Sequence, residues 1–311
     1  MKLKINTLVV CFISFTVSMA FSSEDVATET PKTVDETYPD LATTILKHAK
    51  LIELPKDVLV SCGKVEIKNS DLEGIIERTN EPIKSQIKKN AFFVVEQEAT
   101  GRILLQLATK DKPNSDAKES KQEENKQIQS YLMKIAEKAV VSDDETKKFY
   151  DDNLPMFGGA KYEQVKDQIR QYLLQEKQQE AVMEHIRGLG KNIDIFVSEN
   201  WAKEQSVIAK DNPVDKARAS GKPSMVDFGA DGCGPCDLMT PILKELKEKY
   251  DGKLNILFVH VREEQILGAR FGIGSIPTQV FYDKDGKELF RHSGFLPKDA
   301  IEKKFTELGM K

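Results

Sequence analysis

The sequence predicts two parts of different fold class: a largely α-helical N-terminal part and a C-terminal α/β part with a mixed sheet flanked by helices. The length of 311 residues suits about two domains. Residues 40–201 are rich in Lys, Glu, Gln, Leu and Ile and poor in glycine. From residue 213 onward, short apolar runs alternate with helical stretches, and Gly and Pro become frequent. We place the join within 203–223.

The first twenty residues are typical of an export signal. Lys2 and Lys4 precede an apolar run over 8–17, and Ser18-Met19-Ala20 offers small residues where a signal peptidase reads. The run is shorter than the roughly 20 residues that a membrane-spanning helix needs. We therefore expect residues 1–20 to be cleaved near Ala20 and the mature protein to be periplasmic.

The charge balance indicates which partners to expect. The formal net charge is −4, which gives no electrostatic reason to expect nucleic acid or an anionic membrane surface as a partner. Export places the cysteines in an oxidising compartment, where a cysteine pair can cycle or persist as a disulfide.

The helical part, residues 21–205, has patterns that predict its elements in order. The run 58–67 predicts a short β-hairpin, and apolar residues at helical spacing predict one long helix over 81–109. A polar loop over 110–126 and a helix over 127–140 follow. Ser142 is a predicted N-cap, and a last long helix begins at Tyr162 and stops at Leu189-Gly190.

This part resembles the N-terminal chaperone module of SurA-type periplasmic folding factors. The resemblance rests on the hairpin over 58–67, the helix start at 70–72, the segments 141–145 and 149–151, and the closing pieces 162–165, 169–170 and 193–195. It implies binding of unfolded chains. The parvulin domain of that family is absent, so nothing supports prolyl isomerase activity. A plain helical dimerisation or spacer domain is the alternative, and a homodimer stays open.

The α/β part, residues 206–311, is predicted from alternating strand and helix patterns. A strand, the motif helix and a second strand come first, followed by a second helix, two strands around a hairpin turn at 283–286, and a last helix. The predicted ranges in this order are 224–230, 236–250, 254–261, 263–271, 278–282, 288–292 and 298–308.

Two cysteines stand where the first strand turns into the motif helix. Cys233-Gly234-Pro235-Cys236 is an arrangement for thiol–disulfide exchange, because a helix N-terminus stabilises the thiolate of Cys233. Cys236 lies one turn further, close enough to form a disulfide with it. We expect Cys233 to be the nucleophile and Cys236 to release the product.

A structural zinc site is the rival interpretation of two cysteines at this spacing. Zinc needs four ligands, usually from a second pair of cysteines or histidines. The chain has four cysteines and four histidines. Cys11 lies in the predicted signal, Cys62 is single and the histidines are scattered. We therefore expect no metal and no other cofactor.

From residue 213 onward the chain resembles thioredoxin. Gly234 and Pro235 match the intervening pair of that family, and 274–278 matches the loop that faces the cysteines. The resemblance implies a fairly reducing couple, a cis bond before Pro277, and a backbone at Ile276 that presents itself to an extended substrate. Asp227, in an apolar strand, should be buried and resist ionisation. The resemblance implies that it moves the proton of the second cysteine.

The sequence departs from the thioredoxin pattern at three positions. Gly232 and Gly229 stand where aromatic residues are usual, and Phe258 stands where a buried lysine faces the acid. We expect a weaker apolar rim around the thiols and no charge partner for Asp227. Altered substrate choice and exchange that depends more on pH should follow. Cys62 lies in an apolar hairpin strand, where burial as a small hydrophobe is favoured over pairing between chains.

Two functions remain in competition. The first is an exported oxidoreductase that reduces or isomerises disulfides in protein substrates, with a helical module that binds unfolded chains. It would take electrons from a membrane partner of the kind that serves thioredoxin-like systems. The second is a holdase or assembly factor in which the cysteine pair is secondary. The direction of electron flow and the client stay open.

Overall fold

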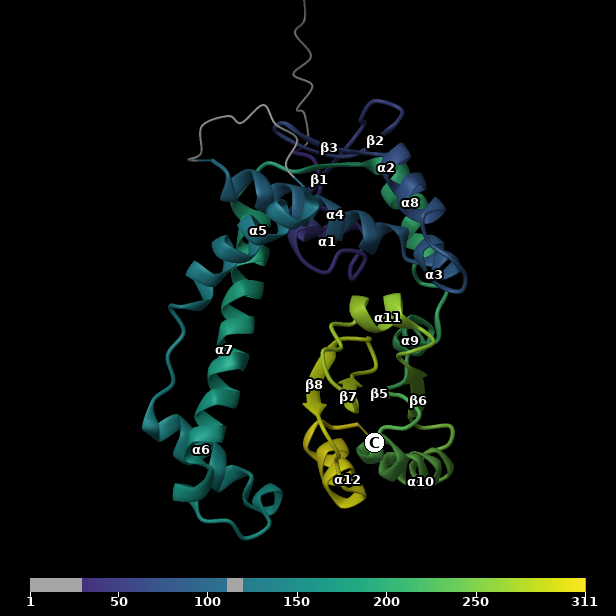
Figure 1. The fold of residues 1–311 in the computed structure, drawn as a ribbon. Coiled ribbons are helices and arrows are strands. Elements are labelled where there is room, and N and C mark those ends of the chain that lie inside the picture. The colour runs from purple at the N-terminus through teal and green to yellow at the C-terminus, as the bar shows by residue number, and fades with distance from the viewer. Residues whose placement is uncertain (1–29, 111–119, 311) are drawn as a thin grey trace, which may run out of the picture. The chain divides into compact units, whose positions relative to one another are not determined.

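A computed structural model describes residues 30–110 and 120–310, without the side chains of 155 and 156 (Figure 1). The predicted signal peptide lies outside the described residues. In the part of the chain that is described, no helix is both long and apolar enough to cross a bilayer. Two four-stranded sheets are present, one in each predicted half.

The N-terminal half is mostly helical and carries a small sheet. Its strands run in the order β1-β4-β2-β3, with β1 parallel to β4 and the other neighbours antiparallel. The elements are α1 Val34–Thr37, η1 Ile45–His48, β1 Lys50–Ile52, β2 Val58–Cys62, β3 Val65–Lys68, α2 Asn69–Glu77, α3 Ile83–Lys89, α4 Ala91–Ala108, α5 Lys121–Ala136, α6 Asp143–Asp152, η2 Leu154–Phe157, α7 Tyr162–Asn192, β4 Phe196–Ser198 and α8 Glu199–Ile208.

Two local predictions for this half are confirmed. The hairpin forms as β2 and β3, and Cys62 in β2 is buried, with 6% of its surface exposed. Ser142 caps α6, because its hydroxyl accepts from the N–H of Glu145 while the Glu145 carboxylate accepts from the N–H of Ser142.

Several boundary predictions for this half are wrong. The helix predicted over 81–109 breaks at Asn90, whose backbone is not helical and whose side-chain amide donates to the carbonyl of Gln86. The helix after the polar run begins at Lys121, where the hydroxyl of Ser120 caps it. The closing piece 193–195 resembles the last strand of the SurA-type module, but the strand of this chain is Phe196–Ser198.

Gly190 does not end a helix, although glycine is a common helix stop. Helix α7 runs on to Asn192, and a Cβ at Gly190 would lie 2.3 Å from the carbonyl oxygen of Ile45. Because Gly190 has no side chain, α7 can approach η1 closely at this position.

The C-terminal half has a mixed sheet with helices on both faces (Figure 1). Strand order is β6-β5-β7-β8, with β5 and β6 parallel and the other neighbours antiparallel. Its elements are α9 Pro213–Arg218, β5 Ser224–Gly229, α10 Gly234–Lys249, β6 Asn255–His260, α11 Gln265–Arg270, β7 Thr278–Tyr282, β8 Glu288–Ser293 and α12 Lys298–Glu307. Every predicted element is present, with ends shifted by at most two residues.

Successive side chains of β5 point to opposite faces of this sheet, so the strand contributes to one apolar cluster on each face. Met225 faces α10 and α12, in an apolar cluster with Met239 and Phe305. Val226 and Phe228 face the opposite side, in a cluster with residues of α9 and α11. Asp227 and Gly229 share the face of Met225, so the strand directs an acid and a glycine toward the start of α10.

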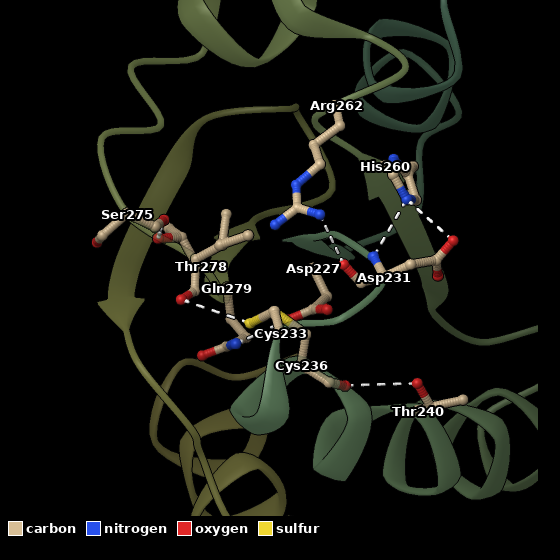
Figure 2. Close-up of a disulfide and its surroundings, with 11 residues drawn as sticks. Asp227, Asp231, Cys233, Cys236, Thr240, His260, Arg262, Ser275, Thr278 and Gln279 are labelled. Carbon is tan, nitrogen blue, oxygen red and sulfur yellow. Dashed lines mark hydrogen bonds and ion pairs between the residues drawn. A yellow bond between two sulfur atoms is a disulfide. The ribbon is translucent and has the colours of Figure 1, made fainter.

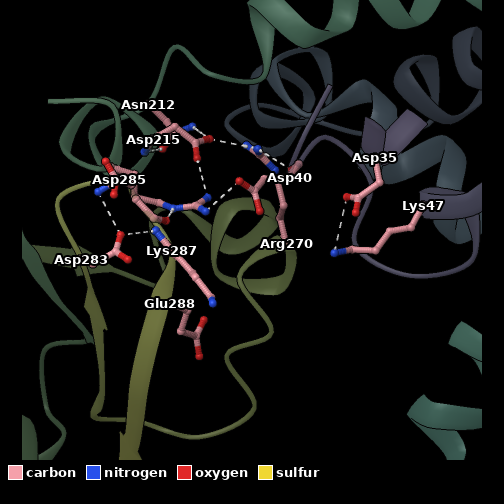
Figure 3. Close-up of polar contacts among 12 residues, drawn as sticks. Asp35, Asp40, Lys47, Asn212, Asp215, Arg270, Asp283, Asp285, Lys287 and Glu288 are labelled. Carbon is pink, nitrogen blue, oxygen red and sulfur yellow. Dashed lines mark hydrogen bonds and ion pairs between the residues drawn. The ribbon is translucent and has the colours of Figure 1, made fainter. Parts of the chain in front are cut away.

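The segment predicted as the join is largely helical, because it contains the end of α8 and all of α9. Asp215 of α9 is buried and pairs with Arg218 and Arg270, at 3.2 and 2.9 Å. Both arginines also donate to Asp40: Arg218 to its carboxylate and Arg270 to its backbone carbonyl oxygen. Asp40, Asp215 and Arg270 are labelled in Figure 3. The domain boundary near residue 205 stays a prediction.

Candidate functional site

The cysteine pair occupies the first turn of α10. Cys233 is the N-cap, with extended backbone, and the helix begins at Gly234 with Pro235 in its first turn. The two cysteines form a disulfide, with their Cα atoms 5.2 Å apart (Figure 2). Cys233 is partly exposed, whereas Cys236 is buried. Of the two cysteines, only Cys233 is therefore accessible to a large substrate.

The loop before β7 faces this pair. The Ile276–Pro277 peptide bond is cis, as the resemblance implied. The sulfur of Cys233 lies 3.9 Å from the carbonyl oxygen of Ile276. Gly234 and Pro235, which follow Cys233 in the chain, are exposed. The structure brings these four residues together, and their contact with a substrate stays a prediction.

Asp227 is fully buried on β5, at 0% exposure. Burial raises its pKa from 3.8 to about 6, although a hydrogen bond from Gln279 opposes the rise. The Nε2 of Gln279 donates to Oδ1 of Asp227 at 2.7 Å. Figure 2 draws both side chains close to the disulfide. Asp227 is therefore a buried acid that can exchange a proton near neutral pH.

Phe258 corrects the expectation of a weakened apolar rim. Its side chain is 48% exposed, and a Cβ built on Gly229 would lie 2.8 Å from the Phe258 ring and 3.5 Å from Cβ of Cys236. Phe258 thus fills the space that a side chain at Gly229 would need. The aromatic ring comes from β6 rather than from β5, and it lies next to the inner cysteine.

The turn before Cys233 is held by residues that sequence reasoning missed. The N–H of Asp231 donates to Nε2 of His260 at 3.2 Å, and Nη1 of Arg262 donates to the carbonyl oxygen of Asp231 at 2.9 Å (Figure 2). Gly232 has a φ of +70°, in the left-handed region that favours glycine. This backbone is the physical reason for a glycine in place of the usual aromatic residue.

The positions of the cysteine and histidine side chains are relevant to the alternative of a structural zinc site. Within 30–110 and 120–310, no group of three or more His, Cys, Asp or Glu side chains is placed to hold a metal ion. Cys62 is a free, buried thiol whose pKa is raised, first by burial and then by the charge of Asp194. A raised pKa makes Cys62 a poor nucleophile.

Comparison with known protein families identifies a match in the C-terminal half. Residues 211–309 match the model of a thioredoxin-like domain. Thioredoxin of Staphylococcus saprophyticus is 45% identical over 78 residues, which cover 25% of this chain and 74% of that protein. Thioredoxin of Borreliella burgdorferi is 37% identical over 81 residues, which cover 26% and 68%.

Among solved structures, the crystal structure of chloroplastic thioredoxin z matches with 32% identity and a TM-score of 0.29. That match covers 32% of this chain and 88% of the other. The helical half stays unidentified by these matches, and its resemblance to SurA-type factors stays a prediction.

Proposed function

Because the chain belongs to the thioredoxin family through residues 211–309, we propose that it is an exported oxidoreductase that reduces or isomerises disulfides in protein substrates. One observation carries the proposal: the partly exposed Cys233 caps α10 opposite the Ile276 carbonyl, while its partner Cys236 is buried. An extended substrate would lie along Ile276 and the cis Pro277, with Gly234 and Pro235 on the other side.

The reaction uses the pair in two steps. The reduced Cys233 thiolate attacks a substrate disulfide, so a Cys233–substrate bond forms and the other substrate sulfur leaves as a thiolate. Cys236 then loses its proton to Asp227 and attacks the sulfur of Cys233. The Cys233–substrate bond breaks and the second substrate thiolate leaves. Two electrons have passed to the substrate, and the Cys233–Cys236 disulfide remains.

Further turnover as a reductant needs electrons, for which we propose a membrane electron-donor protein of thioredoxin-like systems. In isomerisation, a second substrate thiol resolves the mixed disulfide, and no net electrons are used. We propose that residues 21–205 bring unfolded or misoxidised chains to Cys233, and dimerisation through this part would favour isomerisation.

Insulin-disulfide reduction by the full chain, with dithiothreitol as reductant, tests the proposal. Cys233→Ser should reduce the rate to the uncatalysed background, because a serine hydroxyl cannot form the mixed disulfide. Cys62→Ser is the matched control and should keep the wild-type rate, since Cys62 is buried in β2. An unchanged rate in Cys233→Ser would exclude the proposal.

Two further measurements separate the directions of exchange. A scrambled disulfide substrate regains its native pairing only if the protein isomerises. Alkylation of thiols in whole cells reports whether Cys233 and Cys236 are held reduced, as a reductase or isomerase requires. A pair held mostly oxidised would instead indicate an oxidase or a dormant site.

A holdase is the second candidate, and exposed apolar side chains of the helical half favour it. Met133, Val140, Leu154 and Tyr172 are 61%, 76%, 50% and 46% exposed. Suppression of the aggregation of an unfolded protein should then survive Cys233→Ser unchanged. If suppression survives and no insulin reduction is seen with the wild-type chain, the holdase is the better description.

A further inference from the structure

Asp227 lies between neighbours that carry no positive charge. Its partner in register on β6 is Phe258, and its partner on β7 is Gln279. Gln279 is fully buried, like Asp227 itself, and donates through Nε2 to Oδ1 of the acid at 2.7 Å. Burial of an amide costs free energy unless hydrogen bonds compensate, and the bond to Asp227 is one that Gln279 makes.

The two oxygens of Asp227 are in different situations. Oδ1 accepts from Gln279, whereas Oδ2 is buried and has no hydrogen-bond partner among the residues that the structure describes. Cys236 packs against the end of the same strand. A Cβ added at Gly229, two residues after Asp227, would lie 3.5 Å from the Cβ of Cys236. The unpartnered oxygen is therefore the one free to receive a proton.

We propose that Gln279 is a positioning residue for proton transfer: its amide holds Asp227 through Oδ1 and leaves Oδ2 to exchange a proton with Cys236. This inference rests on the proposed thiol–disulfide exchange. During reduction of a substrate, the proton leaves the sulfur of Cys236 and binds Oδ2, so Cys236 attacks as a thiolate. The amide stabilises the carboxylate form, because a hydrogen bond from a neutral donor favours the charged acceptor.

Other titratable groups near this carboxyl must be considered. On the elements packed against β5 these are Cys236 of α10, His260 of β6 and His292, which pairs in register with Gln279 on β8. Burial lowers the pKa of His292, although a contact with the carbonyl of Phe295 opposes this. Only burial and the Gln279 hydrogen bond shift the pKa of Asp227 among the described residues. Removal of the amide should therefore act directly on Asp227.

The test is the pH dependence of iodoacetamide alkylation of Cys233 in the reduced full chain, between about pH 5 and 9. Gln279→Met keeps the length of the side chain and removes the donor. The inflection due to Asp227 should move upward by about one pH unit, as expected for loss of a hydrogen bond to a charged group. Gln279→Leu is a second variant without a donor, and thermal unfolding reports whether both fold.

Control variants distinguish a failure of the Gln279 inference from a failure of the proposed function. Gln205→Met removes a buried amide of α8 in the helical half and should leave the profile unchanged. Asp227→Asn should remove the inflection, and adding Gln279→Met to it should change nothing further. An unchanged inflection in both Gln279 variants, or an effect that persists without Asp227, overturns the inference alone. An Asp227→Asn profile identical to the wild type overturns the proposed role of Asp227 in exchange.

Discussion

Two buried carboxylates, one in each half of the molecule, have opposite surroundings. Glu96 of α4 is fully buried and accepts four hydrogen bonds. They come from the N–H and hydroxyl of Thr43 and from the N–H groups of Thr44 and Leu46, at 2.7 to 3.2 Å. Asp227 is equally buried and accepts one, from Gln279. The first acid has nearly all its acceptor capacity used, and the second does not.

The difference distinguishes a structural acid from a reactive one. Glu96 satisfies donors at the start of η1, where backbone N–H groups lack partners within the helix. It therefore connects α4 to the segment before η1, and all four of these donors are satisfied by one carboxylate. Asp227 keeps an oxygen free at the price of stability, as expected for a group that must accept and release a proton.

The largest expected effect comes from removing the structural acid. Glu96→Leu leaves three backbone N–H groups and a hydroxyl without their acceptor, so the free energy of unfolding should fall by about 3–5 kcal/mol. Urea unfolding measures this change. Glu96→Gln, which keeps one acceptor oxygen, should lose less. A loss below about 1 kcal/mol in Glu96→Leu would contradict the structural role.

Removal of the reactive acid, Asp227, should change the free energy of unfolding in the opposite direction and stabilise the protein above about pH 6. The pKa of Asp227 is raised from 3.8 to about 6 in the folded chain, so the folded state binds its proton more tightly than the unfolded state. The contribution of Asp227 to wild-type stability should therefore decrease as pH rises from about 4 through 6, by about 3 kcal/mol in total. Asp227→Asn should remove this decrease and be more stable than the wild type at pH 8. An equal pH dependence of stability in both chains would show that folding does not raise the pKa of Asp227.

A smaller effect should follow from adding a charge beside Asp227. Phe258→Lys places an ammonium on the neighbouring strand, in register with the acid, and should lower the pKa of Asp227 by about one unit. Phe258→Met is the control that removes the ring without adding charge. Titration of the Asp227 carboxyl by NMR measures the shift. Equal titration in the two variants would mean that the lysine points to solvent.

The α/β half was predicted almost completely, because its patterns are local. Each strand is a short apolar run, and each helix repeats apolar residues at helical spacing. The helical half was predicted less well, since the position of a helix end depends on contacts that a periodic pattern does not contain. Asn90 breaks a helix through its own backbone and side chain, and Gly190 continues one because η1 packs closely there.

The candidate site was predicted as far as single residues and family patterns allow. Cys233, Cys236, Pro277 and Asp227 are where the sequence placed them, and the pair forms the expected disulfide. Gln279, His260 and Arg262 were missed. A polar residue at Gln279, directly before the apolar Val280 and Phe281 in a buried strand, was the one available signal.

The sequence by itself determined the α/β elements, the cysteine pair at a helix start and a buried acid six residues earlier, because each depends on neighbours along the chain. The tertiary structure alone decided which residue meets that acid. Gln279 reaches Asp227 across 52 positions, and the Phe258 ring reaches the space at Gly229 from another strand. Such contacts arise from strand order and register, which place distant residues on one face of a sheet.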